Sequence, residues 1–151
     1  MAYGYMGNSP AAATANGGGA TILDIYSPAL IRGIIKVCEC YISGLVIGAG
    51  WKFKVFRDDG TNYVFLGEIT FTSITGLNTV PFWLPIEKGD LIATYTPTGA
   101  KSTPDLTSQA TGSVYQTADV TTTQAKTSWA SLDYRFAQRG TIFSRVQPFS
   151  T

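Results

Sequence analysis

Any chemistry in this chain would have to rest on carboxylates and amines, because its 151 residues include no histidine. Ser-His-Asp and Cys-His catalysis are therefore excluded in their usual forms, and so are metal sites that use histidine. Glu39 and Glu68 are the only carboxylates near the centres of expected strands, and two facing glutamates on a concave sheet would suit a glycosidase. Exposed or charge-paired strand residues are the more common case. We therefore expect neither glutamate to be catalytic and interpret the chain as a non-enzyme.

Two cysteines, Cys38 and Cys40, stand two residues apart. On a strand, residues i and i+2 project in parallel from one face, with Cα atoms near the ~7 Å limit for a disulfide. We therefore predict two packed thiols. Half of a zinc site is the alternative, but the second pair of ligands that zinc needs is missing. No metal and no cofactor are expected.

Two aromatic residues are candidates for contact with a ligand or another subunit. Trp83 falls between Pro81 and Pro85 in an alternating strand whose other face is apolar, so its ring should face outward. Tyr115 stands alone in a polar stretch. Outward aromatic rings can stack on sugars or pack in subunit contacts. We favour a subunit contact and leave a glycan site open.

These residues lie on expected β-strands joined by short turns. Large apolar side chains alternate with lysines over 51–55, which predicts a strand. The residues Asp58-Asp59-Gly60 that follow predict a hairpin turn. A calcium-binding loop at this position is disfavoured, because the EF-hand ligand pattern is missing. Further strands are expected at 21–23, 30–43, 62–72, 77–86, 91–95, 132–136 and 141–146. Pro81 and Pro85 place one of them at a sheet edge. With no crossover helix, the pattern predicts an all-β fold, an antiparallel β-sandwich of the jelly-roll kind.

Two polar segments depart from this pattern. Residues 1–20 are rich in Gly, Ala and Asn, and we interpret them as a flexible N-terminal arm. Residues 21–151 would then form a single β-sandwich domain. Within it, residues 97–128 are rich in Thr, Ser, Gln and Gly, so we expect a long polar surface excursion with one short strand at 113–117.

The stretch 80–95 consists of an apolar strand, Pro85-Ile86, then Lys88-Gly89-Asp90 and a second apolar strand ending in Tyr. Together with the hairpin over 51–67, it resembles jelly-roll modules of phage and viral surface proteins, carbohydrate-binding modules, and heads of the tumour-necrosis-factor and complement type. The resemblance covers about residues 30–95. It implies a fold and a habit of binding or assembling, and it assigns no role to any residue.

Composition bears on function by exclusion. Only 14% of residues are charged, and 11 basic against 10 acidic residues leave a net charge of +1. We expect no nucleic-acid partner, because phosphate binding is mostly electrostatic. Weak net charge also gives little protection against association. We therefore expect a homo-oligomer, with a trimer favoured, and other particle proteins as further partners.

The leading hypothesis is a non-enzymatic structural component of a self-assembling particle or fibre, for example a viral or phage virion protein. The alternative is a carbohydrate- or receptor-binding module. Residues 1–8 have neither the basic start nor the apolar run of a signal peptide, and no apolar window approaches the ~20 residues of a membrane span. We expect synthesis in the cytoplasm, no membrane insertion, and a virion location if the particle is viral.

Overall fold

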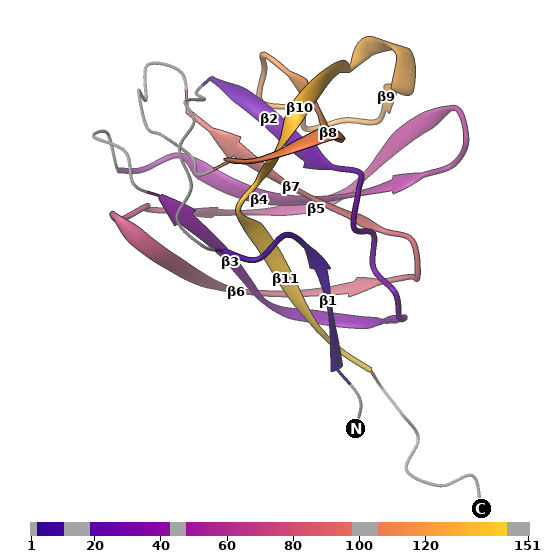
Figure 1. Ribbon diagram of the computed structural model, residues 1–151. Helices are drawn as coiled ribbons and strands as arrows, with labels where there is room; N and C mark the ends of the chain where they lie inside the picture. Colours follow the sequence, from indigo (N-terminus) through magenta and orange to yellow (C-terminus); the bar gives the residue numbers. More distant parts are fainter. Residues whose placement is uncertain (1–2, 11–18, 43–47, 98–105, 145–151) are drawn as a thin grey trace, which may run out of the picture.

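A computed structural model of the protein describes residues 3–10, 19–42, 48–97 and 106–144, and the side chains of all of these except 106–111 and 133–135. Two antiparallel sheets pack face to face (Figure 1). The smaller has the order β1 (Tyr3–Gly7), β11 (Gln138–Phe143), β3 (Gly33–Ile42), β6 (Gly76–Ile86). The larger has the order β10 (Ala130–Phe136), β8 (Leu106–Gln116), β2 (Ala20–Asp24), β7 (Leu91–Thr96), β4 (Trp51–Asp58), β5 (Asn62–Phe71), β9 (Gln124–Ala125). The predicted all-β antiparallel sandwich is confirmed.

The main core lies between the sheets and follows the strand alternation. Trp51, Phe53 and Val55 of β4 point inward and are buried, while the two lysines between them point to the outer face, as predicted. Facing them across the interface are Ile35 and Ile142 of the smaller sheet. Burial of each such side chain contributes about 1.5–3 kcal/mol to folding. Gln138 adds a polar link between the layers, accepting from the Thr94 hydroxyl at 2.5 Å and donating to the Ile22 carbonyl at 3.2 Å.

The turn and edge predictions are confirmed. Asp58-Asp59-Gly60 closes the β4–β5 hairpin, where Gly60 adopts a φ of +99° and the Asp59 carboxylate accepts hydrogen bonds from the amides of residues 61 and 62. The strand β6 lies at one end of the smaller sheet and pairs only with β3 among the described residues. Pro81 and Pro85 are exposed there. Prolines are tolerated because an edge strand has no second neighbour that needs their missing donors.

Cys38 and Cys40 are fully buried on the inner face of β3, as predicted. Burial raises the pKa of the Cys38 thiol, and the neighbouring Cys40 and Glu39 raise it further. A thiol reagent should therefore modify neither cysteine in the folded protein and both after denaturation without reductant. Spectroscopic thiol titration in native buffer and in denaturant measures this directly. Absence of reactive thiols in the denatured chain would contradict the prediction.

The predicted N-terminal arm is wrong for residues 3–7. These residues form β1, which pairs with β11 from Tyr3–Phe143 to Gly7–Arg139. Met6 is fully buried in the main core. An edge strand needs few inward side chains, so one methionine among small and polar residues is enough to dock it. Ala20 likewise belongs to β2, and residues 11–18 of the predicted arm lie outside the described residues.

The predicted surface excursion over 97–128 is also wrong for most of its described part. The strand β8 is 11 residues long and pairs with both β10 and β2; its threonines, its valine and its tyrosine are residues that favour strands, although the segment is polar overall. Residues 117–129, here called the strap, contain β9 and a 3-10 turn, η1 (Lys126–Ser128), and cross the outer face of the larger sheet. The segment 98–105 is outside the described residues.

A second apolar cluster fixes the strap to that outer face. Val120 and Trp129 of the strap are 4% and 7% exposed, and they pack against Phe56 and Tyr63 of the hairpin. The Trp129 ring meets both of these rings edge-on, with centroids 5.5 and 5.6 Å apart.

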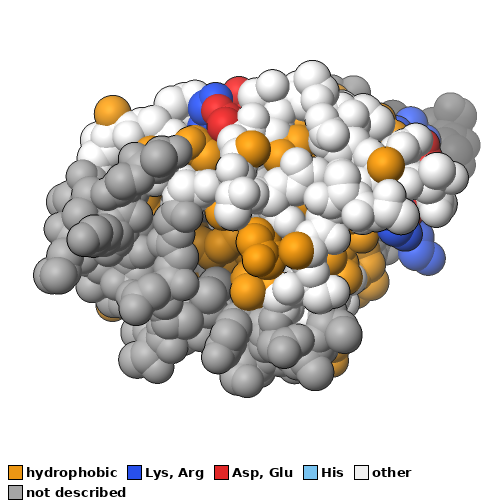
Figure 2. All heavy atoms as spheres, turned by 90° about the horizontal axis from the view of Figure 1, so that it is seen from above, with side chains coloured by type: hydrophobic (Ala, Val, Ile, Leu, Met, Phe, Trp, Pro, Cys, Tyr) orange, Lys and Arg blue, Asp and Glu red, His pale blue; other side chains and the backbone are white. Residues whose placement is uncertain are grey.

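Seen from above the view of Figure 1, the described atoms are mostly backbone and uncharged polar side chains (Figure 2). None of the described residues belongs to a helix of the length and apolar character that a membrane crossing requires.

Candidate functional site

The outer face of the smaller sheet carries a row of aromatic side chains from β1, β11 and β6, which reaches from one edge of the sheet to the other. Tyr3 and Tyr5 of β1 are 63% and 44% exposed, and their rings lie 5.8 Å apart. Tyr3 also meets Phe143 of β11, at 6.3 Å. Trp83 of β6 closes the row at the far edge and is 62% exposed. We call these four side chains the aromatic face: Tyr3, Tyr5, Phe143 and Trp83.

Two cations bind the row together. The ammonium group of Lys36 on β3 lies 4.3 Å from the ring centroid of Phe143 and 5.4 Å from that of Trp83. At the other end, the guanidinium group of Arg139 lies 4.3 Å from the ring of Tyr5. Cation–π contacts at such distances contribute about 0.5–1 kcal/mol at exposed sites. The rings are thus held in place before any partner binds.

Trp83 sits on an unusual backbone. Its φ of +62° is the only positive value at a non-glycine residue among those the structure describes. Register explains it: Ile35 pairs with Leu84 and Val37 with Pro81, so two residues of β6 stand against Lys36 alone. This β-bulge re-aims the tryptophan. A bulky residue in the left-handed region is a genuine outlier, and such strain concentrates at functional sites.

The other predicted aromatic, Tyr115, does not join this row. It lies on β8 of the larger sheet, opposite Ile22, and is half-buried against the main core. A shallow depression beside it has a volume of about 330 Å³ and is lined by Tyr115, Gln116, Thr117, Ala118, Ser128 and Ala130. None of these residues is charged. Trp83 thus points outward, as the alternation predicted, whereas Tyr115 is half-buried; a ligand or subunit contact stays a prediction for both.

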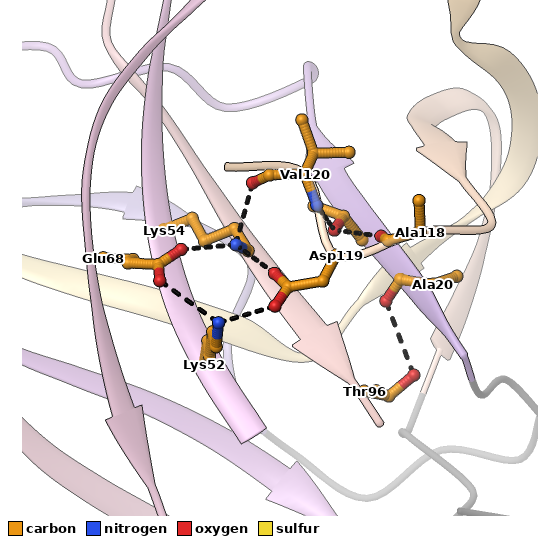
Figure 3. A network of polar contacts seen from close by, with 9 residues as sticks. Ala20, Lys52, Lys54, Glu68, Thr96, Ala118, Asp119 and Val120 are labelled. Atoms are coloured by element: carbon orange, nitrogen blue, oxygen red, sulfur yellow. Dashed lines mark hydrogen bonds and ion pairs between the residues drawn. The ribbon is translucent and has the colours of Figure 1, made fainter. Parts of the chain in front are cut away.

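A second polar site lies beneath the strap, where two lysines and two carboxylates form a closed cycle of ion pairs (Figure 3). We call this cycle the charge ring: Lys52, Lys54, Glu68 and Asp119. The Nζ atom of Lys54 lies 2.6 Å from Glu68 Oε1 and 2.6 Å from Asp119 Oδ1. Lys52 Nζ bridges the other oxygens, at 3.2 Å from Glu68 Oε2 and 2.5 Å from Asp119 Oδ2. Lys54 also donates to the Val120 carbonyl at 2.8 Å.

Solvent exposure differs sharply around this ring. The side chain of Lys54 is completely buried, whereas Lys52, Glu68 and Asp119 are 19%, 26% and 30% exposed. Burial alone would raise the pKa of Asp119, but its hydrogen bonds to the two lysines outweigh burial and lower it. The hydrogen bond to Asp119 raises the pKa of Lys52. In the ionised state the ring therefore holds two positive and two negative charges.

Sequence reasoning missed this ring. The alternation over 51–55 correctly placed both lysines on the outer face, and Glu68 is the cross-strand neighbour of Lys54. Asp119, however, lies 65 residues further along the chain from Lys54, in a segment without a strong pattern. Asp119 reaches the two lysines only because the strap covers them in the folded protein. The single apolar residue Val120 beside Asp119 was the available signal.

Glu39 and Glu68, the two strand-centred glutamates, are both paired with basic side chains. Glu39 on the outer face of the smaller sheet accepts from Arg139 at 3.0 Å, so it cannot face Glu68 on the outer face of the larger sheet. Both glutamates are charge-paired, as the sequence suggested. Among the described residues, no group of three or more Cys, Asp and Glu side chains is placed to hold a metal ion.

A cleft of about 560 Å³ opens at one end of the sandwich, between the smaller sheet and β4. Arg57 lines it, but its guanidinium makes two hydrogen bonds, of 2.8 and 2.9 Å, to the buried carboxylate of Asp90. Arg32, also in the lining, pairs with Glu87 at 3.3 Å. These arginines are neutralised by the chain itself, and the cleft is a weaker ligand site than the aromatic face.

Comparison of the chain with protein-family models, with curated proteins and with solved structures finds no match. The aromatic face and the charge ring are thus the two candidate sites of this chain.

Proposed function

We propose that the protein is a non-enzymatic structural subunit that assembles with copies of itself through the aromatic face. The observation that carries this proposal is the row of rings from β1, β11 and β6, which reaches from one edge of the smaller sheet to the other and ends in Trp83 on a left-handed backbone. Tyr, Trp and Phe are enriched at the centres of protein interfaces. The weak net charge of +1 leaves association unopposed.

The geometry favours contact through the face of the sheet over addition of a strand at its edge. The exposed side of β6 carries Pro81 and Pro85, which lack the amide donors that an added strand would need. The rings of the aromatic face, in contrast, project away from the sheet and keep large exposed fractions. A partner would therefore cover the face and leave the edge of β6 unpaired.

We further propose that the sandwich is a jelly roll. When β8, β9 and β10 are set aside, eight strands remain, and the smaller sheet has the order first, last, third, sixth. The larger sheet then has the order second, seventh, fourth, fifth. Apart from the β4–β5 hairpin, each connection in this set passes from one sheet to the other. Two interlocked Greek keys of this kind make a jelly roll, an architecture that recurs in capsid domains.

We propose assembly as a closed ring, with a trimer as the smallest such form. A face that meets a different surface on the next copy generates a ring when the rotation closes. A particle or fibre built from such rings, including a virion, is the setting we propose, with other particle proteins as further partners.

The second candidate function is binding of a carbohydrate or a receptor. One observation favours it: Trp83 is pre-positioned by a bulge, with Lys36 fixed at 5.4 Å from its ring. An exposed indole stacks on the apolar face of a sugar, and an ammonium group donates to hydroxyl groups. In that case Trp83 would contact the ligand in a protein that remains monomeric.

Sedimentation of the full-length chain tests the leading proposal. We expect a defined oligomer at tens of micromolar, because the aromatic face would be buried between copies. A single monomeric species across this range would contradict self-assembly and favour the binding module. Titration with a glycan panel, followed by tryptophan fluorescence in the wild type and in Trp83→Gly, would then decide whether a sugar is the ligand at Trp83.

A further inference from the structure

The charge ring beneath the strap has the geometry of a reaction site as well as that of a salt bridge. We propose that Lys54 and Asp119 condense to an intramolecular amide bond, which links β4 covalently to the strap. Glu68 acts as the proton acceptor, and Lys52 supports the reacting carboxyl group. This inference concerns a self-modification of the chain and does not depend on the proposed assembly function.

The reacting groups are already in contact. Lys54 Nζ lies 2.6 Å from Asp119 Oδ1, an oxygen bonded to the carboxyl carbon that the amine would attack. Holding two groups in this way corresponds to an effective concentration of about 10⁵–10⁸ M. Amines and carboxylates on a flexible surface lack this advantage. Lys54 cannot swing away, because the Val120 carbonyl also holds its ammonium group, at 2.8 Å.

The two other members of the ring match the roles that the reaction needs. Glu68 Oε1 lies 2.6 Å from Lys54 Nζ, within the range for direct proton transfer from the ammonium group. Lys52 Nζ lies 2.5 Å from Asp119 Oδ2, where negative charge develops when the amine adds to the carboxyl carbon. Because Lys52 also contacts Glu68, the proton can pass from Glu68 towards Asp119 around the ring. Glu68 thus gains a chemical role that the sequence alone did not indicate.

The reaction balances without any further reagent. The Nζ–Cγ bond forms, and one C–O bond of Asp119 breaks. The ammonium group of Lys54 starts with three hydrogens: one remains on the amide nitrogen, and two leave with the released oxygen as water. One positive and one negative charge disappear together. The remaining pair, Lys52 and Glu68, stays neutral overall.

The surroundings favour the amide over its hydrolysis. The side chain of Lys54 is completely buried, and the rings of Phe65 and Tyr95 lie 5.6 and 5.8 Å from its nitrogen. A desolvated lysine is a better nucleophile, and exclusion of water opposes the reverse reaction. The product is also less polar than the buried ion pair that it replaces, so condensation removes the cost of keeping an ammonium group away from water. The bond would tie the strap to β4 across 65 residues of chain.

The intact mass of the wild-type protein tests this proposal directly. The native chain is held at neutral pH until its mass is constant, then denatured and measured. We expect a mass lower than that of the sequence by one water molecule, after allowance for removal of Met1. Trypsin should then release a branched peptide in which residues 53–57 are joined to residues 102–126, and fragmentation should place the link between Lys54 and Asp119. A constant mass equal to that of the sequence overturns the proposal, as does a link through Lys52.

Variants separate the roles within the ring. Lys54→Met and Asp119→Ala should each abolish the loss of water completely, and Glu68→Gln should slow it at least tenfold. Lys126→Met is the matched control, because Lys126 also forms a lysine–aspartate pair, with Asp58 at 2.8 Å, but at an exposed position. That variant should lose water as the wild type does. Loss of water at the wild-type rate in Glu68→Gln would remove Glu68 from the mechanism, and the branched peptide of the wild type tests the bond itself even if a variant fails to fold.

Discussion

Asp119→Ala is expected to lower the free energy of unfolding by about 3–5 kcal/mol, whereas Lys54→Met should lower it by only about 1–2 kcal/mol. Asp119→Ala leaves the ammonium group of Lys54 fully buried with Glu68 as its sole carboxylate, which must also serve Lys52. Lys54→Met removes the buried charge itself and keeps a similar volume. The remaining carboxylates, of Glu68 and Asp119, are partly exposed to water and keep Lys52 as their ion-pair partner. The asymmetry follows from which charge is left without its partner.

The difference between the two variants is the same whether or not the amide bond forms, because both lack one of its two halves; in a wild type that carries the bond, both losses are larger by the contribution of the bond. Denaturant unfolding followed by tryptophan fluorescence is suitable, since Trp51 and Trp129 are buried and report on the two apolar clusters. Lys126→Met serves as the surface control, with an expected change of about 0–1 kcal/mol. Equal losses in Lys54→Met and Asp119→Ala would show that burial of the Lys54 charge carries no cost.

Sequence patterns predict the layers of this fold well where strands alternate. The alternation over 51–55 places Phe53 inward and Lys54 outward, and the structure has both orientations. What the pattern cannot predict is that Lys54 is buried on the outer side as well. Its cover comes from the strap, which is anchored by Val120 and Trp129 in an otherwise polar stretch. Isolated apolar residues produce no periodicity, so tertiary packing decides the outcome.

The same limit explains why the sequence did not predict the N-terminal strand β1, nor the two tyrosines that this strand adds to the aromatic face. Met6 is one apolar side chain in a segment rich in glycine and tyrosine, and composition alone favoured an arm. The outward direction of Trp83 followed from strand alternation and the flanking prolines. Its left-handed backbone did not, because the bulge depends on how β3 pairs with β6 around Lys36. Tyr3 and Tyr5 join Trp83 on one face only once β1 docks on β11.

Trp83→Gly is expected to weaken assembly strongly while leaving the folded subunit almost as stable as before. A tryptophan with a φ of +62° carries about 1–3 kcal/mol of backbone strain, which glycine relieves. The losses are small, since the side chain is 62% exposed and its contact with Lys36 contributes only about 0.5–1 kcal/mol. Association should lose at least about 2 kcal/mol, or roughly 30-fold in the dissociation constant, if Trp83 is a central contact.

Paired measurements distinguish this from general damage to the fold. Sedimentation gives the association constant, and denaturant unfolding gives the stability of the same preparation. Trp83→Asn should weaken assembly similarly, because asparagine tolerates the left-handed backbone but lacks the ring. Ile74→Ser is the matched control: it removes an apolar side chain that is 55% exposed on the loop before β6, away from the aromatic face, and should leave assembly unchanged. Undiminished assembly in Trp83→Gly would contradict a role of Trp83 in the subunit contact. A monomeric wild type whose fluorescence is quenched by a sugar, without quenching in Trp83→Gly, would identify a glycan as the partner of the strained tryptophan.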